Sequence, residues 1–146
     1  MEIYTIGFTK RSARDFFETI KSSGIRRLLD VRLNNSSQLA GFSKKDDLQY
    51  FLRSICDVTY VHDPVLAPTA ELLTSFKKTK SSTWDDYASG FLRLMASRKI
   101  EEHLHAADFQ ARTVLLCSEF DPQHCHRRLV LEYLQPHWGN FAITHL

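Results

Sequence analysis

Short β-prone segments alternate with amphipathic helical patterns along the whole chain. The β-prone runs occupy positions 3–6, 28–32, 58–61, 113–116 and 141–144, and apolar residues at helical spacing fall between them. This alternation is typical of βαβ crossovers, which place parallel strands in one sheet with helices on both faces. We therefore predict an α/β fold: a Rossmann-like three-layer sandwich with a mainly parallel five-stranded sheet. The strand order stays open.

Capping signatures indicate where the helices begin. Ser12, Ser43 and Thr83 are each followed three residues later by Asp, which favours a capping box at each position. Asp121 and Pro122 mark the last helix, because a capping carboxylate is followed by proline at the first helical position. This start places Cys125 in the first turn of that helix.

Length and composition limit the classes of protein that fit. A chain of 146 residues with 43% hydrophobic residues favours a single globular domain over residues 1–146. A net charge of +2 is too balanced for a general nucleic-acid-coating protein, so nucleic acid is a possible partner that the charge does not indicate. Because we find neither a signal peptide nor a spanning segment, we expect a cytoplasmic protein that does not act at a membrane.

The three cysteines are expected to be free thiols, because none forms a C-x-x-C pair and the chain is expected to be cytoplasmic. Cys56 lies beside the apolar stripe of its helix and is expected in the core. A polar loop over residues 34–38 follows the second strand and is expected to be functional. Lys77, Lys78 and Lys80 are expected to form a solvated face.

Polar, titratable and thiol residues follow the predicted strands. In open α/β sheets ligands bind beyond the carboxyl ends of the strands. The residues expected at that edge include Gly7, Thr9, Arg11, Asp30, Arg32, Cys117, Glu119 and His145, joined by Cys125, His126 and Arg127 at the last helix. Their convergence predicts a pocket for an anionic small molecule or a nucleotide.

The leading hypothesis is an enzyme-like site built around Cys125. A helix N-terminus favours a thiolate, so Cys125 is the candidate nucleophile or redox thiol. Cys117, at the end of a buried strand, is either a core residue or the second member of a redox pair. Glu119 or Asp30 would act as acid or base, although Asp30 can equally pair with an arginine.

Ligand binding is assigned to a second group of residues at the same edge. Guanidinium groups bind phosphate and carboxylate bidentately, so Arg11, Arg32 and Arg127 are the candidate anion binders. The other expected ligand contacts are Gly7, Thr9, His126 and His145.

Two alternatives remain open at this stage. The same pocket would serve a non-catalytic module that binds a nucleotide or nucleic acid and regulates a partner. A structural zinc site would combine Cys117, Cys125, His126 or His145, and Asp30 or Glu119. No standard zinc spacing occurs, so we predict no cofactor and keep zinc as the alternative.

Several short motifs together resemble the domain of unknown function 488 family. They are Tyr4-Thr5-Ile6-Gly7, Thr9-x-Arg11-Ser12, Asp30-Val31-Arg32, Cys117-x-Glu119-x-Asp121-Pro122-x-x-Cys125-His126-Arg127 and a last strand ending in His145. The resemblance implies a compact α/β domain whose motif residues suggest an enzyme, and the family carries no settled reaction.

The chain resembles a subgroup of that family. Phe8 stands where the family usually has His, and Leu33-Asn34-Asn35-Ser36 replaces a loop that contains Pro. These variants imply an altered substrate or a loss of catalysis.

Overall fold

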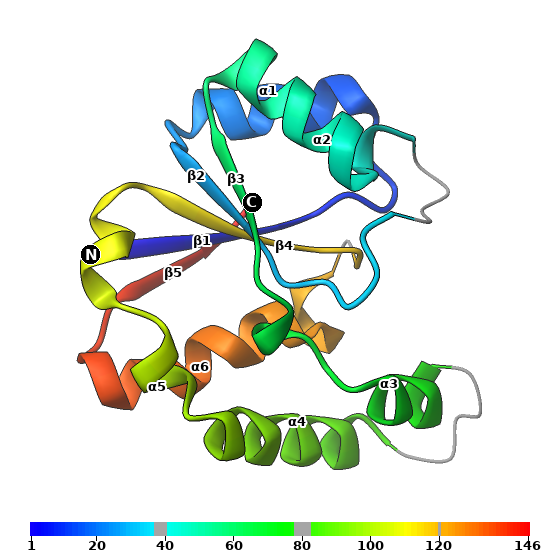
Figure 1. The fold of residues 1–146 in the computed structure, drawn as a ribbon, viewed down its shortest axis with the longest axis vertical. Coiled ribbons are helices and arrows are strands. Elements are labelled where there is room, and N and C mark those ends of the chain that lie inside the picture. Colours follow the sequence, from blue (N-terminus) through cyan, green and yellow to red (C-terminus); the bar gives the residue numbers. More distant parts are fainter. Residues whose placement is uncertain (37–40, 78–82, 120) are drawn as a thin grey trace.

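A five-stranded parallel sheet lies between two helical layers in the computed structural model, which describes residues 1–36, 41–77, 83–119 and 121–146 (Figure 1). The strands are β1 (Glu2–Gly7), β2 (Arg27–Asp30), β3 (Thr59–His62), β4 (Thr113–Cys117) and β5 (Ala142–His145), in the order β3-β2-β4-β1-β5. All four neighbouring pairs are parallel. The predicted three-layer α/β sandwich is confirmed.

The helices divide between the two faces of the sheet. Figure 1 shows α1 (Ala13–Ser22) and α2 (Lys45–Phe51) on one face, and α3 (Ala70–Lys77), α4 (Trp84–Arg98), α5 (Ile100–His103) and α6 (His126–Trp138) on the other. The chain runs from β1 through β2 to β3 in one direction across the sheet, then returns through β4 to β5. Right-handed crossovers in opposite directions necessarily cover opposite faces.

Strand β4 occupies the centre of the sheet and is buried over its whole length, as expected for a strand covered on both faces. Val114 and Leu116 belong to the core beneath α1 and α2, whereas Leu115 and Cys117 belong to the core on the α3–α6 face. This alternation points Cys117 toward the layer that contains α6. Cys56 is buried in the other core, as predicted.

Two of the three predicted Ser/Thr caps are present. Ser12 accepts a hydrogen bond from the Asp15 amide at 3.0 Å, while the Asp15 carboxylate pairs with Arg11. Thr83 forms a complete capping box with Asp86 at the start of α4. The prediction at Ser43 is wrong, because Ser43 is buried in the 3-10 turn Gly41–Ser43 and the N-cap of α2 is Lys44.

The last helix begins later than predicted. Asp121 caps a 3-10 turn, Pro122–His124, by accepting a hydrogen bond from the Gln123 amide at 2.9 Å. The regular helix α6 starts at His126, so Cys125 is its N-cap residue and does not lie in the first turn.

Ser37, Gln38, Lys78 and Lys80 lie outside the described residues. In the part of the chain that the structure describes, no helix has the length and apolar character needed to cross a membrane.

Candidate functional site

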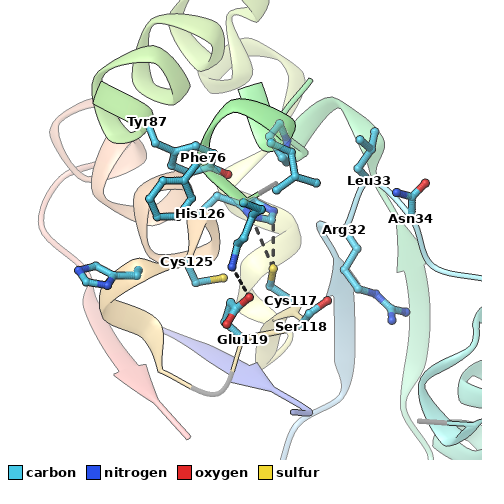
Figure 2. A pocket seen from close by; sticks show the side chains of 14 residues that line it. Arg32, Leu33, Asn34, Phe76, Tyr87, Cys117, Ser118, Glu119, Cys125 and His126 are labelled. Atoms are coloured by element: carbon cyan, nitrogen blue, oxygen red, sulfur yellow. Dashed lines mark hydrogen bonds and ion pairs between the residues drawn. The ribbon is translucent and has the colours of Figure 1, made fainter. Parts of the chain in front are cut away.

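A cavity of about 160 Å³ opens at the carboxyl ends of β2 and β4 (Figure 2). These strands are neighbours, but the chain leaves β2 toward α2 on one face and leaves β4 toward α6 on the other. Divergence of adjacent connections opens a crevice at the sheet edge, where α/β proteins bind ligands. The loop after β2, helices α3 and α4 and the turn into α6 all contribute to its walls.

A cluster of two thiols and one imidazole lines this cavity. The Cys117 Sγ lies 3.5 Å from the His126 Nδ1. The Cys125 Sγ, the Cys117 Sγ and an imidazole nitrogen of His126 all lie within 4.8 Å of one another, and all three residues are buried. Figure 2 shows the two sulfur atoms turned toward each other beside the imidazole ring. The structure therefore brings together both cysteines that sequence analysis singled out.

A backbone carbonyl fixes the His126 ring. Its Nε2 lies 2.7 Å from the carbonyl oxygen of Val31, which can only accept a hydrogen bond, so Nε2 carries the proton. In the neutral imidazole the lone pair is then on Nδ1, the nitrogen nearer to Cys117. Phe91 packs against the ring at a centroid distance of 5.3 Å. The unprotonated nitrogen is thus presented to the thiols.

The two buried thiols have opposite pKa shifts. Burial disfavours ionisation of Cys125, but the hydrogen bond from Cys117 and the neighbouring His126 and Arg127 side chains outweigh it and hold the pKa of Cys125 well below its usual value. The hydrogen bond to Cys125, together with burial, holds the pKa of Cys117 well above its usual value. The first negative charge on the pair therefore resides at Cys125.

Three residues that were predicted to bind ligand instead lie against the turn between β4 and α6. The Thr9 amide donates to the carbonyl of Ser118 at 3.0 Å, and the Arg127 guanidinium donates to the carbonyl of Glu119. A Cβ atom at Gly7 would overlap the Glu119 carbonyl group. Gly7, Thr9 and Arg127 do not line the cavity. Their positions therefore stabilise the turn and give no support to a role in ligand binding.

Asp30 is fully buried in an ion pair. Its Oδ1 and Oδ2 accept hydrogen bonds from the Arg32 guanidinium at 2.9 and 2.8 Å, and the Tyr60 hydroxyl donates to Oδ2. Burial and this carboxylate raise the pKa of Tyr60. Of the two roles considered for Asp30, acid–base catalysis and pairing with an arginine, the structure shows the pairing. Asp30 lies outside the cavity wall. Its position gives no support to the acid or base role.

The arginines do not assemble into one anion site. Arg11 binds the Asp15 carboxylate and the Leu146 carbonyl, and fully buried Arg127 faces Glu119. Arg32 lines the cavity, but its guanidinium points away from the thiols in Figure 2.

His145 also lies outside the cavity wall, with its Nδ1 2.6 Å from the Thr5 Oγ1. Of the seven predicted ligand-binding residues, only Arg32 and His126 line the cavity.

Sequence analysis missed the opposite wall of the cavity. Phe76 of α3 and Tyr87 of α4 form it, with ring centroids 4.9 Å apart. Lys77 and Glu119 pair at the mouth, where their side chains are 38% and 42% exposed. His124 also lines the cavity. The helical stripe containing Tyr87 predicted only a core residue, and no local signal connects α3 with the thiols.

Fold and site together define a parallel α/β protein with a buried thiol–imidazole cluster at the carboxyl edge of its sheet. A family model described as Domain of unknown function DUF488 matches residues 12–134, and the chain belongs to this family. The expected family resemblance is thereby confirmed. Neither a comparison with curated proteins nor one with solved structures gave a match.

Proposed function

We propose that this protein is an enzyme that binds a small ring-shaped molecule in the cavity and acts on it at the Cys117–Cys125–His126 cluster. The supporting observation is that all three reactive side chains line one cavity while they are buried from bulk solvent. Buried reactive groups that converge in a concave pocket are characteristic of catalytic sites.

The size and lining of the cavity favour a flat, largely apolar ligand. A protein cavity of about 150 Å³ holds one benzene molecule, so the observed 160 Å³ accommodates about one ring. Leu33, Leu73, Phe76 and Tyr87 supply apolar contacts for the faces of such a ring. A heterocyclic base has these dimensions, and its polar or anionic substituents would lie at the mouth beside Lys77.

Reactivity at the cluster takes one of two chemical forms. A thiolate attacks an electrophilic atom of the bound ring directly, or the three side chains hold a metal ion that polarises the ring or a water molecule. Both forms require the ligand to reach the same buried wall. The ligand-binding part of the proposal can therefore be tested before the reaction is known.

The test is a thermal-shift and NMR screen of ring-sized compounds, including nucleobases and nucleotides. For a compound that binds, Phe76→Ala should weaken affinity by about tenfold or more, because it removes one cavity wall. Phe51→Ala is the matched control, since Phe51 is also a partly buried helical phenylalanine but packs in the other core. The proposal is refuted if no such compound binds or if both variants weaken binding equally.

Turnover separates an enzyme from a binding module. We expect the wild-type protein to convert a bound compound, and Cys117→Ser and Cys125→Ser to abolish conversion. Tight binding to the cavity with no conversion by the wild-type protein would instead establish the non-catalytic module.

A further inference from the structure

We propose that Cys117, Cys125 and His126 hold a zinc ion, with both thiolates and the His126 Nδ1 as ligands and a fourth coordination position facing the cavity. The role of this ion in catalysis rests on the proposed function. Zinc binding itself is measured without any substrate, so the two proposals can fail separately.

The spacing of the side chains matches a tetrahedral zinc centre. Zinc–sulfur and zinc–nitrogen bonds of about 2.3 and 2.0–2.1 Å at tetrahedral angles place the nitrogen and sulfur ligands about 3.6 Å apart, and two sulfur ligands about 3.8 Å apart. The observed distance from His126 Nδ1 to Cys117 Sγ is 3.5 Å. Because all three ligand atoms lie within 4.8 Å, closure around an ion requires a shift of about 1 Å or less.

The surroundings of His126 suit a metal ligand. Zinc-binding histidines usually donate their second ring N–H to a carbonyl or carboxylate, which fixes the ring and its tautomer. The Nε2–H of His126 makes this contact with the Val31 carbonyl at 2.7 Å and leaves Nδ1 for the metal. Val31 directly follows β2 and is fully buried, so the acceptor is held rigidly.

Charge balance also favours a divalent ion. Both cysteines bind zinc as thiolates, and two thiolates with a neutral imidazole and Zn²⁺ form a site with no net charge. Two thiolates in a low-dielectric environment are costly unless cations compensate their charge, and a divalent ion compensates both. Cys117, Cys125 and His126 are 6%, 2% and 6% exposed, so this compensation matters here.

The number of protein ligands indicates which kind of zinc site this is. Within the described ranges, no fourth His, Cys, Asp or Glu side chain joins the group. Structural zinc ions usually have four protein ligands, whereas catalytic ions have three and an open position. All three residues line the cavity, so the fourth position is directed toward a water molecule or a bound ligand.

The experiment compares metal binding by the wild-type chain and by single-cysteine variants. Protein prepared with zinc, then dialysed against metal-free buffer, is analysed for metal content, and the metal-free protein is titrated with Co²⁺. We expect about one zinc per wild-type chain. With Co²⁺ we expect visible absorption typical of a tetrahedral ion and ultraviolet sulfur-to-cobalt charge transfer.

Three variants locate the ion. Cys117→Ser and Cys125→Ser should each lose stoichiometric zinc and the charge-transfer band, while Cys56→Ser should keep both. Cys56 is the matched control because it is also a buried free cysteine but lies in the other core, where its Sγ contacts the Phe17 carbonyl. Circular dichroism checks the fold of each variant.

Wild-type measurements keep the proposal testable even where a variant does not fold. Zinc titration of the wild-type protein should raise the melting temperature and saturate at about one ion per chain. Substoichiometric zinc, a cobalt spectrum without sulfur charge transfer, or equal zinc content in folded Cys56→Ser and Cys125→Ser would overturn the proposal.

Discussion

Gly7→Ala should destabilise the protein by forcing the β4–α6 turn away from β1. An alanine Cβ at this position would lie 2.5 Å from the carbonyl carbon of Glu119 and closer still to its oxygen. Real Cβ atoms essentially never approach another heavy atom to within 3.0 Å, and no side-chain rotation relieves a clash with backbone. The turn must therefore shift, and with it the carbonyl that accepts the hydrogen bond from Arg127.

Two contributions set the size of the effect. Overpacking a close backbone contact costs about 1–3 kcal/mol. Losing a hydrogen bond to a buried guanidinium costs about 1.5–3 kcal/mol more. We expect the free energy of unfolding to fall by roughly 3–5 kcal/mol, a large share of the 5–15 kcal/mol of a typical domain.

Urea denaturation followed by circular dichroism measures this loss as a lower midpoint at an unchanged slope. Gly41→Ala is the matched control, because a Cβ at Gly41 meets no atom of the described residues within 4 Å. That variant should stay within about 0.5 kcal/mol of the wild type. If Gly7→Ala costs less than about 1 kcal/mol, the turn is not held against β1 and the reasoning fails.

Three further predictions concern ion pairs, a helix cap and pH. Asp30→Asn should lower the free energy of unfolding by about 3–5 kcal/mol in urea denaturation, because it leaves Arg32 buried without its carboxylate. Asp57→Asn should change that free energy by less than about 1 kcal/mol, because Asp57 forms only two exposed ion pairs among the described residues, with Arg26 at 4.0 Å and with Arg53 at 3.9 Å. Thr83→Ala should lower the free energy of unfolding by about 1 kcal/mol, because it removes the N-cap of α4. An unchanged midpoint of urea denaturation would contradict the role of Thr83 as a cap. Partial burial and the charges of Arg127 and Arg128 lower the pKa of His145, so its NMR titration midpoint should fall below the usual 6.5. Because the unfolded chain protonates His145 first, its contribution to stability should be lost as pH falls through about 6.5, and His145→Asn should remove that part of the pH dependence.

The helix starts show how far local sequence signals reach. Thr83 and Ser12 cap their helices as predicted because a cap needs only residues within one turn. Ser43 has the same signature but is buried in the 3-10 turn that precedes α2, and Lys44 occupies the N-cap position of that helix. The delayed start of α6 has a similar origin, since Asp121 and Pro122 first close a separate turn.

Sequence patterns predicted the thiol side of the candidate site but not its opposite wall. Cys117 and Cys125 flank one strand-to-helix turn, so their proximity follows from a short stretch of chain. Phe76 and Tyr87 precede them by roughly 30–50 positions, and only the packing of α3 and α4 onto this face brings them near. The pairing of Arg32 with Asp30 was one of the two alternatives that the sequence offered, whereas the contact between Arg127 and the Glu119 carbonyl depends on the path of the β4–α6 turn, which residue type does not reveal.

The sequence by itself determined the class of fold, the approximate positions of the five strands, two of the four predicted helix starts, and the edge of the sheet where chemistry-bearing residues gather. These properties depend on hydrophobic period and capping, which act over a few residues. Only the tertiary structure decided the order β3-β2-β4-β1-β5, the walls of the cavity and the approach of His126 to Cys117. Each of these depends on which distant segments bury their apolar faces together, a choice made by the packing of the whole chain.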